Sequence, residues 1–149
     1  MRLFLAAMMA FFLTGPALAQ NAATPVEVSA DKALEWDRTA KTYTASGNAE
    51  IIQGDTQINA DDIVAHYRET PRSEFDIYKM IATGSVVLKA QGSTAYGDDG
   101  VYDLDQNRAV LNGSDLRMVS PDQTVTAKDR FEYDLAKGEV RAIGDAKVV

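Results

Sequence analysis

The fold is decided by the stretch TYTASGNAEI, residues 42–51. Every second residue in this stretch is apolar or small, and the residues between them are mostly polar. A period of two is typical of a β-strand with one buried face. Gly47 lies in the middle of the stretch, where the lack of a side chain weakens pairing and favours a bend or a bulge. The stretch therefore predicts a bent, half-buried strand.

The same spacing from an aromatic residue to a glycine recurs along the chain. The regular copies, each eleven positions long, are Trp36 with Gly47, Tyr102 with Gly113, and Tyr133 with Gly144. A fourth copy, from Tyr67 to Gly84, is seventeen positions long, and its added residues 69–73 (ETPRS) have the composition of a loop inserted into a hairpin. Self-similar spacing of this kind indicates a fold of repeated strand units.

Apolar or small residues keep a constant phase before each repeated glycine. Four and two positions before it stand Tyr43 and Ala45, Met80 and Ala82, Ala109 and Leu111, and Val140 and Ala142. After the third glycine the alternation shifts by one residue. Asp115 stands at a position that is apolar in the other copies, and the apolar residues are Leu116 and Met118 instead. One extra residue reverses the faces of everything downstream. We therefore expect a bulge there, with Asp115 interrupting the apolar face.

Polar stretches at residues 53–55, 91–93 and 120–123 supply turns between these strands, and no segment of helical period follows residue 20. We expect an all-β fold, an elongated open antiparallel β jelly roll built from repeated strand units. Stacked units of this kind leave an unpaired strand at each end, and such a strand is a template for another chain.

The first residues have the pattern of a secretory signal peptide. Arg2 is followed by eleven apolar residues, 3–13, then by Gly15-Pro16 and by the small-residue site at 17–19. The run is shorter than the roughly 20 apolar residues of a membrane span, although an uncleaved anchor is the alternative. We expect a signal peptide over residues 1–19, cleaved after Ala19, and a soluble periplasmic domain over residues 20–149.

Composition excludes several kinds of chemistry. The chain has no cysteine and one histidine, His66, which leaves no disulfide, no zinc ribbon and no site that needs two imidazoles. Its formal net charge is −7, and no two basic residues are adjacent. A negatively charged protein without clustered basic residues does not attract the phosphate backbone of a nucleic acid. We therefore expect no nucleic-acid partner, no metal and no cofactor.

Two acidic pairs are the candidates for catalysis. Asp61-Asp62 and Asp98-Asp99 both stand at the junction between repeats, where turn or capping chemistry is the simpler explanation. Neighbouring residues of a strand also point to opposite faces. We therefore expect that the protein is not an enzyme. The alternative is a small carbohydrate-active enzyme that uses the Asp pairs. The repeated aromatics Trp36, Tyr102 and Tyr133 are expected in the core, with sugar stacking as the alternative.

The phrases that carry a resemblance to a known family stand in the first half of the chain. They are VSAD (28–31), YTASGNA (43–49), QG (53–54) and INAD (58–61). With them the chain resembles the LptA family of periplasmic lipopolysaccharide transport proteins, also called OstA-like. The similarity is strongest over residues 26–67 and continues more weakly to the C-terminus.

The resemblance implies an open jelly roll that holds lipopolysaccharide acyl chains in its apolar interior and conveys lipopolysaccharide from the inner to the outer membrane. It also implies assembly end to end. The N-terminal edge would meet an inner-membrane LptC-like partner, and the C-terminal edge would meet an outer-membrane LptD-like translocon. The chain stops at Val149 without the basic tail of better-known members, which leaves the form of the C-terminal contact open. A structural β-repeat protein of the cell envelope with a closed interior is the other alternative.

The inward phase of the strands predicts the residues of the site. Those expected to contact lipid are Tyr43, Ala45, Ile51, Ile58, Met80, Val86, Leu88 and Leu111. Those expected at the assembly edges, where head-to-tail self-association would occur, are Val26, Val28, Val140 and Val148. Several inward positions are alanines, namely Ala45, Ala49, Ala60, Ala82, Ala142 and Ala146. Because alanine fills less volume than leucine or isoleucine, we expect unfilled space that admits acyl chains.

Overall fold

The computed structural model describes residues 24–149, and within them it contains strands and no helix. The strands are β1 (Val26–Ser29), β2 (Ala33–Asp37), β3 (Thr42–Gln53), β4 (Thr56–Thr70), β5 (Ser73–Ala90), β6 (Ser93–Asp103), β7 (Arg108–Asn112), β8 (Leu116–Val119), β9 (Thr124–Ala127), β10 (Arg130–Asp134), β11 (Glu139–Ile143) and β12 (Lys147–Val148). No helix that could cross a membrane occurs in this part of the chain. The signal peptide predicted at residues 1–19 lies outside the described residues.

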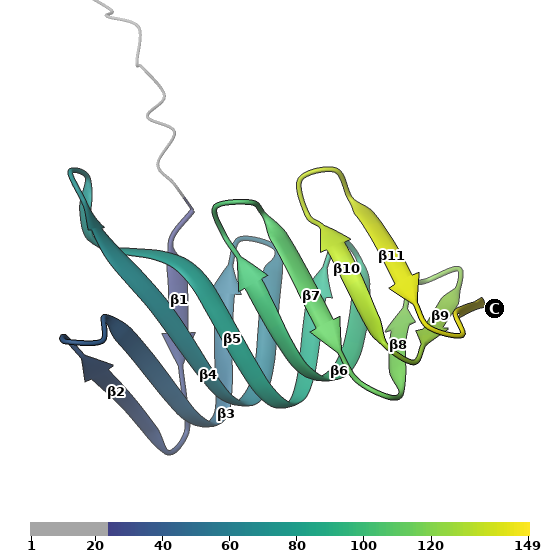
Figure 1. Ribbon diagram of the computed structural model, residues 1–149, viewed down its shortest axis with the longest axis horizontal. Coiled ribbons are helices and arrows are strands. Elements are labelled where there is room, and N and C mark those ends of the chain that lie inside the picture. The colour runs from purple at the N-terminus through teal and green to yellow at the C-terminus, as the bar shows by residue number, and fades with distance from the viewer. Residues whose placement is uncertain (1–23) are drawn as a thin grey trace, which may run out of the picture.

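The strands form one antiparallel ribbon that folds over into two facing layers (Figure 1). Layer I contains β2, β7, β10 and β11 together with the halves of β3 to β6 that pair beside them. Layer II contains β1, β8, β9 and β12 together with the other halves of β3 to β6. The strands cross between the layers along one side, the bend edge, and the turns lie along the opposite side, the rim. This arrangement confirms the open antiparallel jelly roll expected from the sequence.

The bend edge is built by the repeated glycines. Gly47, Gly84 and Gly144 have φ angles of 79°, 85° and 90°. Each is followed by a second residue of positive φ, and these residues are Asn48, Ser85 and Asp145. In β3 and β5 the register shifts at the same place, between Ser46 and Ala49 and between Thr83 and Val86. The predicted bend at Gly47 is therefore confirmed as a bulge that turns the strand from layer I into layer II.

Acidic side chains from neighbouring segments lie against two of these glycines. The position where a Cβ would stand on Gly84 is in contact with the carboxylate of Asp61, and the same position on Gly144 is 2.5 Å from Cγ of Asp129. Asp98 lies in the same way beside Gly113, at 3.2 Å from the Cβ position. Asp61 and Asp98, and the residues that follow them, are exposed. The acidic pairs thus close the bend edge, which accounts for their recurrence.

The third unit crosses between the layers differently from the expectation. A bulge was expected after Gly113, but β7 ends at Asn112 and β8 begins at Leu116, so three residues leave the strand altogether. Both strands pair with β6, but on their other side β7 pairs with β10 in layer I and β8 pairs with β9 in layer II, so the chain changes layer at the break. Asp115 is exposed and Leu116 is fully buried. The apolar face is therefore continuous, and the interruption expected at Asp115 is wrong.

Three of the repeated aromatics, Trp36, Tyr102 and Tyr133, lie in one inward row across layer I, whereas Tyr67 pairs with Ile77 outside this row. Register places Trp36, Tyr43, Ala65, Met80, Tyr102, Ala109, Tyr133 and Val140 side by side. Tyr102 and Tyr133 are each 5% exposed, as expected for core residues. Trp36 lies on the outermost strand of the row, where no further strand covers it among the described residues, and it is 42% exposed, so the core position expected for it is wrong. Its ring contacts that of Phe75, which lies in the β4–β5 hairpin lengthened by the insertion at residues 69–73.

The close contact at Gly84 predicts a measurable cost of substitution. Gly84→Ala should lower the free energy of unfolding by about 2 kcal/mol or more, because alanine is strained at this φ and its Cβ collides with Asp61. Gly92→Ala is the matched control, since Gly92 has a similar φ of 77° but nothing within 4 Å of its Cβ position. Urea unfolding of both variants separates collision from backbone strain. Equal losses for the two variants would contradict the collision.

Candidate functional site

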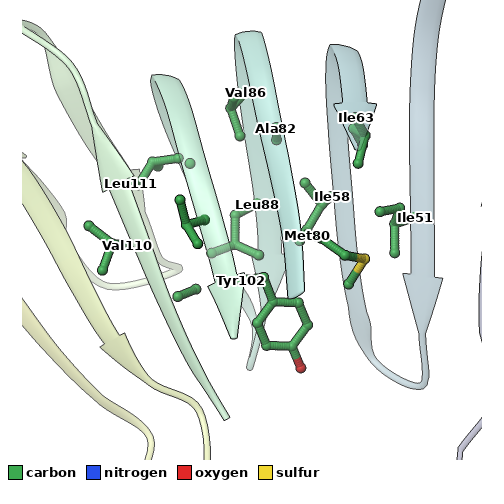
Figure 2. Close-up of a pocket in the computed structure, with 13 residues that line it drawn as sticks. Ile51, Ile58, Ile63, Met80, Ala82, Val86, Leu88, Tyr102, Val110 and Leu111 are labelled. Atoms are coloured by element: carbon green, nitrogen blue, oxygen red, sulfur yellow. The ribbon is translucent and has the colours of Figure 1, made fainter. Parts of the chain in front are cut away.

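The interior between the layers is the candidate site, and its centre is a narrow apolar cavity (Figure 2). Layer II supplies Ile51, Ile58, Val86 and Leu88, and layer I closes the cavity from the other side. The residues from layer I are Ile63, Met80, Ala82, Gly100, Val101, Tyr102, Ala109, Val110 and Leu111. The cavity measures about 20 Å³, which is room for about one water molecule. In this conformation the centre of the interior therefore holds no acyl chain.

Most of the residues predicted to contact lipid meet at this cavity. Ile51, Ile58, Met80, Val86, Leu88 and Leu111 line it. Ala45 is fully buried beside them in the core without lining the cavity, and Tyr43 is half-buried toward the β2 end. Sequence reasoning did not place Ile63 or Tyr102 in the site. Ile63 was detectable, because it stands two residues before Ala65 on the inward phase of the same strand.

The unfilled space expected from the small inward residues is not present at the centre. Ala45 and Ala49 are fully buried, and Ala60 and Ala82 are each 4% exposed. These alanines lie close to the bend edge, where the layers converge, so the layers approach one another instead of leaving a void. Small side chains here allow a short distance between the layers. Unfilled volume is found where the layers lie farther apart.

Larger grooves lie where the interior reaches solvent. At the C-terminal end a groove of about 510 Å³ runs between Met118 and Val125 of layer II and Tyr133 and Val140 of layer I. Toward the N-terminal end a groove of about 390 Å³ lies between Val26 of layer II and the start of β5 in layer I. The interior is thus wide at its C-terminal end and narrow at its centre, and the second groove lies along the rim, at the turns next to Gln53, Ser73 and Leu104.

Each end of the molecule presents two unpaired strand edges. Among residues 24–149, β1 and β2 at the N-terminal end pair only with β3, and at the C-terminal end β11 pairs only with β10 and β12 only with β9. The predicted edge residues lie on these strands, with Val26 and Val28 on β1, Val140 on β11 and Val148 on β12. Sequence reasoning missed β2 as an edge. Its inward residues Leu34 and Trp36 are 54% and 42% exposed.

Two tyrosines of the core connect the layers by hydrogen bonds. The hydroxyl of Tyr102 donates to Oε1 of Gln53 over 3.1 Å, and that of Tyr133 donates to Sδ of Met118 over 3.0 Å. Burial raises the pKa of Tyr102, and it raises the pKa of Tyr133 to about 12. No buried polar side-chain atom lacks a hydrogen-bond partner among residues 24–149, and no cluster in that range could hold a metal ion.

The raised pKa of Tyr133 predicts a loss of stability in alkali. Because the folded pKa lies above the unfolded value of 10.0, the unfolded chain releases this proton first, and the free energy of unfolding falls as the pH rises from about 10 to about 12. The Tyr133 share of this loss is about 3 kcal/mol, and Tyr133→Phe should remove it. Tyr96→Phe, at an exposed ring on the outer face, is the control. An alkaline loss of the same size in Tyr133→Phe would contradict the assignment.

Comparison with known proteins agrees with this architecture. The sequence matches the family described as LptA/(LptD N-terminal domain) LPS transport protein over residues 27–139. No curated protein matches it significantly. The fold is similar to the crystal structure of LptH from Pseudomonas aeruginosa, described as the LptA homologous periplasmic component of the conserved lipopolysaccharide transport device. The TM-score is 0.72 at 18% identity, over 85% of this chain and 94% of LptH. Since the family match spans most of the chain, the protein belongs to the LptA/LptD N-terminal-domain family of lipopolysaccharide transport proteins.

Proposed function

We propose that this member of the lipopolysaccharide transport family is a periplasmic carrier that holds acyl chains between its two layers and passes lipopolysaccharide from the inner to the outer membrane. The observation that carries the proposal is the inward face of the sheet. It is apolar along its whole length, from Trp36 at one end to Val140 at the other, and it reaches solvent at the exposed Leu34 and Trp36 and at the C-terminal groove. The family match supports the same substrate.

The energetic need for such an interior is large. Exposing a twelve-carbon chain to water costs on the order of 9 kcal/mol. An apolar lining that continues from one end to the other removes most of that cost during transfer. The polar groups of the described core are the hydroxyls of the buried tyrosines, and those of Tyr102 and Tyr133 are already hydrogen-bonded, to Gln53 and to Met118.

Site-specific photo-crosslinking tests the proposal. A photoreactive residue in place of Ile51 or Leu88, which are 1% and 3% exposed on the inward face, should capture lipopolysaccharide in the native envelope. The matched controls are their neighbours Glu50 and Lys89, which point outward on the same strands, and these should capture none. Lipid captured at Glu50 and Lys89 but not at Ile51 and Leu88 would overturn the inward assignment.

The same experiment distinguishes the alternatives. A structural envelope protein with a closed interior gives no lipid at any position, and a carbohydrate-active enzyme would give capture near Asp61 and Asp98 instead. The structure offers little to the enzyme, because Asp61 lies against Gly84 and Asp98 lies against Gly113. Export of the chain through cleavage after Ala19 is part of the proposal, and the N-terminus of the protein recovered from the periplasm tests it.

We also propose that the molecule assembles head to tail, through β11 and β12 of one copy and β2 and β1 of the next. Continuing the inward rows across such a joint places Val140 beside Trp36 and Val148 beside Val28 of the next copy. The strands would run antiparallel, as everywhere in the sheet. The interiors of neighbouring copies would then join into one, by strand addition. An LptC-like partner at the N-terminal edge and an LptD-like partner at the C-terminal edge would use the same surfaces.

The proposed register makes a specific electrostatic prediction. It places the outward residue Arg141 of β11 opposite Glu35 of β2 in the next copy, and both are exposed in the isolated chain. Opposite charges directly across a strand pair are stabilising, whereas like charges are destabilising. Arg141→Glu should therefore weaken self-association about fivefold, measured as scattering mass against protein concentration.

A mixing experiment provides the control. Glu35→Arg should weaken self-association equally, and an equimolar mixture of Glu35→Arg with Arg141→Glu should recover the complexes, because the reversed charges match again. Arg108→Glu changes the charge of an outward residue on the interior strand β7 and should have no effect. A wild type that stays monomeric at every concentration would exclude self-association, while leaving contacts with other proteins possible.

A further inference from the structure

The rim between the two layers is held together by hydrogen bonds between side chains and turns. Midway along it, the Tyr102 hydroxyl of layer I donates to Oε1 of Gln53 in layer II over 3.1 Å and lies 3.4 Å from Oδ1 of Asn107. Farther toward the C-terminal end, Nε2 of Gln91 in layer II donates to the carbonyl oxygen of Leu135 in layer I over 2.8 Å. Both bonds join residues more than forty positions apart in sequence.

Tyr102 separates the apolar interior from solvent. Its side chain lines the central cavity of about 20 Å³, and it also lines a depression of about 380 Å³ on the rim. Gln53, Gln91 and Leu135 line the same depression. In Figure 2 the phenol ring of Tyr102 lies beside Leu88 and Met80, with its hydroxyl pointing away from the cluster of aliphatic side chains. The tyrosine is thus the boundary at which the interior ends and the rim begins.

We propose that these two contacts, Tyr102 with Gln53 and Gln91 with Leu135, form a latch that keeps the layers together when no lipid is bound, and that the latch must part for acyl chains to enter through the rim. This inference rests on the proposed carrier function. It follows from the dimensions of the interior, because a cavity of about 20 Å³ holds no acyl chain until the layers move apart.

The two long sides of the molecule differ in what opening would require. Along the bend edge the layers are joined by the continuous backbone of β3 to β6, so they cannot separate there. Along the rim they are joined by hydrogen bonds between uncharged groups, and water in the adjoining depression can replace these bonds. The layers can therefore open at the rim while they stay connected at the bend edge.

The test follows how fast lipid reaches the interior. Purified lipopolysaccharide is mixed with protein that carries a photo-crosslinker at Ile51, and the captured fraction is measured against time before illumination. Tyr102→Phe and Gln91→Met remove the latch bonds while keeping the size of each side chain, and each should speed capture about fivefold, the factor that one neutral hydrogen bond carries. Tyr96→Phe, on the outer face, and Gln106→Met, at an exposed rim position, should leave the rate unchanged.

A reversible lock gives the opposite perturbation. The chain has no cysteine, so Thr56→Cys in layer II and Leu135→Cys in layer I, which line the same depression, can be joined by a reducible thiol crosslinker. The locked protein should lose lipid capture at Ile51, and reduction should restore it in the same sample. Restoration shows that the double variant is folded.

The outcomes separate the latch from the carrier function. Capture by the locked protein at the rate of the reduced protein would overturn the latch and leave the carrier function intact, with lipid entering through the ends. Unchanged rates in both Tyr102→Phe and Gln91→Met would overturn the assignment of these contacts. A failure of the wild type and of every variant to capture lipid would overturn the proposed function itself.

Discussion

Each long strand must leave one layer and enter the other at a fixed point, and the rest of the structure depends on this crossing. A glycine of positive φ makes the turn in β3 at Gly47 and in β5 at Gly84, and Gly144 does the same between β11 and β12. The space that a side chain would occupy on each of them is filled by the side chain of a polar or charged residue, Lys32, Asp61 or Asp129. Because the crossings of successive strands all lie along the bend edge, the two layers face one another along the whole molecule. The apolar phase of every strand then points into one shared interior.

Local alternation was enough to predict the strands and the inward faces, because the faces of a strand follow from its period alone. Ile51, Met80 and Leu88 are buried for this reason. What depends on distant neighbours was not predictable. The break at residues 113–115 lies where the chain passes from β7, which pairs with β10, to β8, which pairs with β9. Tyr102 bonds to Gln53, 49 positions away, and no local pattern marks that pair.

The alanines show where composition alone misleads. The volume of each side chain is known from the sequence, but the distance from that side chain to the opposite layer is not. At the bend edge the layers converge, and there Ala49 and Ala60 produce close contact. The centre of the interior is therefore closed, and the grooves lie at the C-terminal end and along the rim. In a carrier built in this way, the two layers pack against each other when no ligand is bound, and they would have to move apart to hold one.

The pairs of edge strands at the two ends have a mechanical consequence. Each end presents one edge from layer I and one from layer II, so a neighbour that pairs with both is attached along two separate lines. A joint made by a single strand can swivel, whereas two lines on opposite sides of an axis resist torsion. Successive subunits would then keep a constant angle to one another, and the twist of the sheet would set the pitch of the whole assembly.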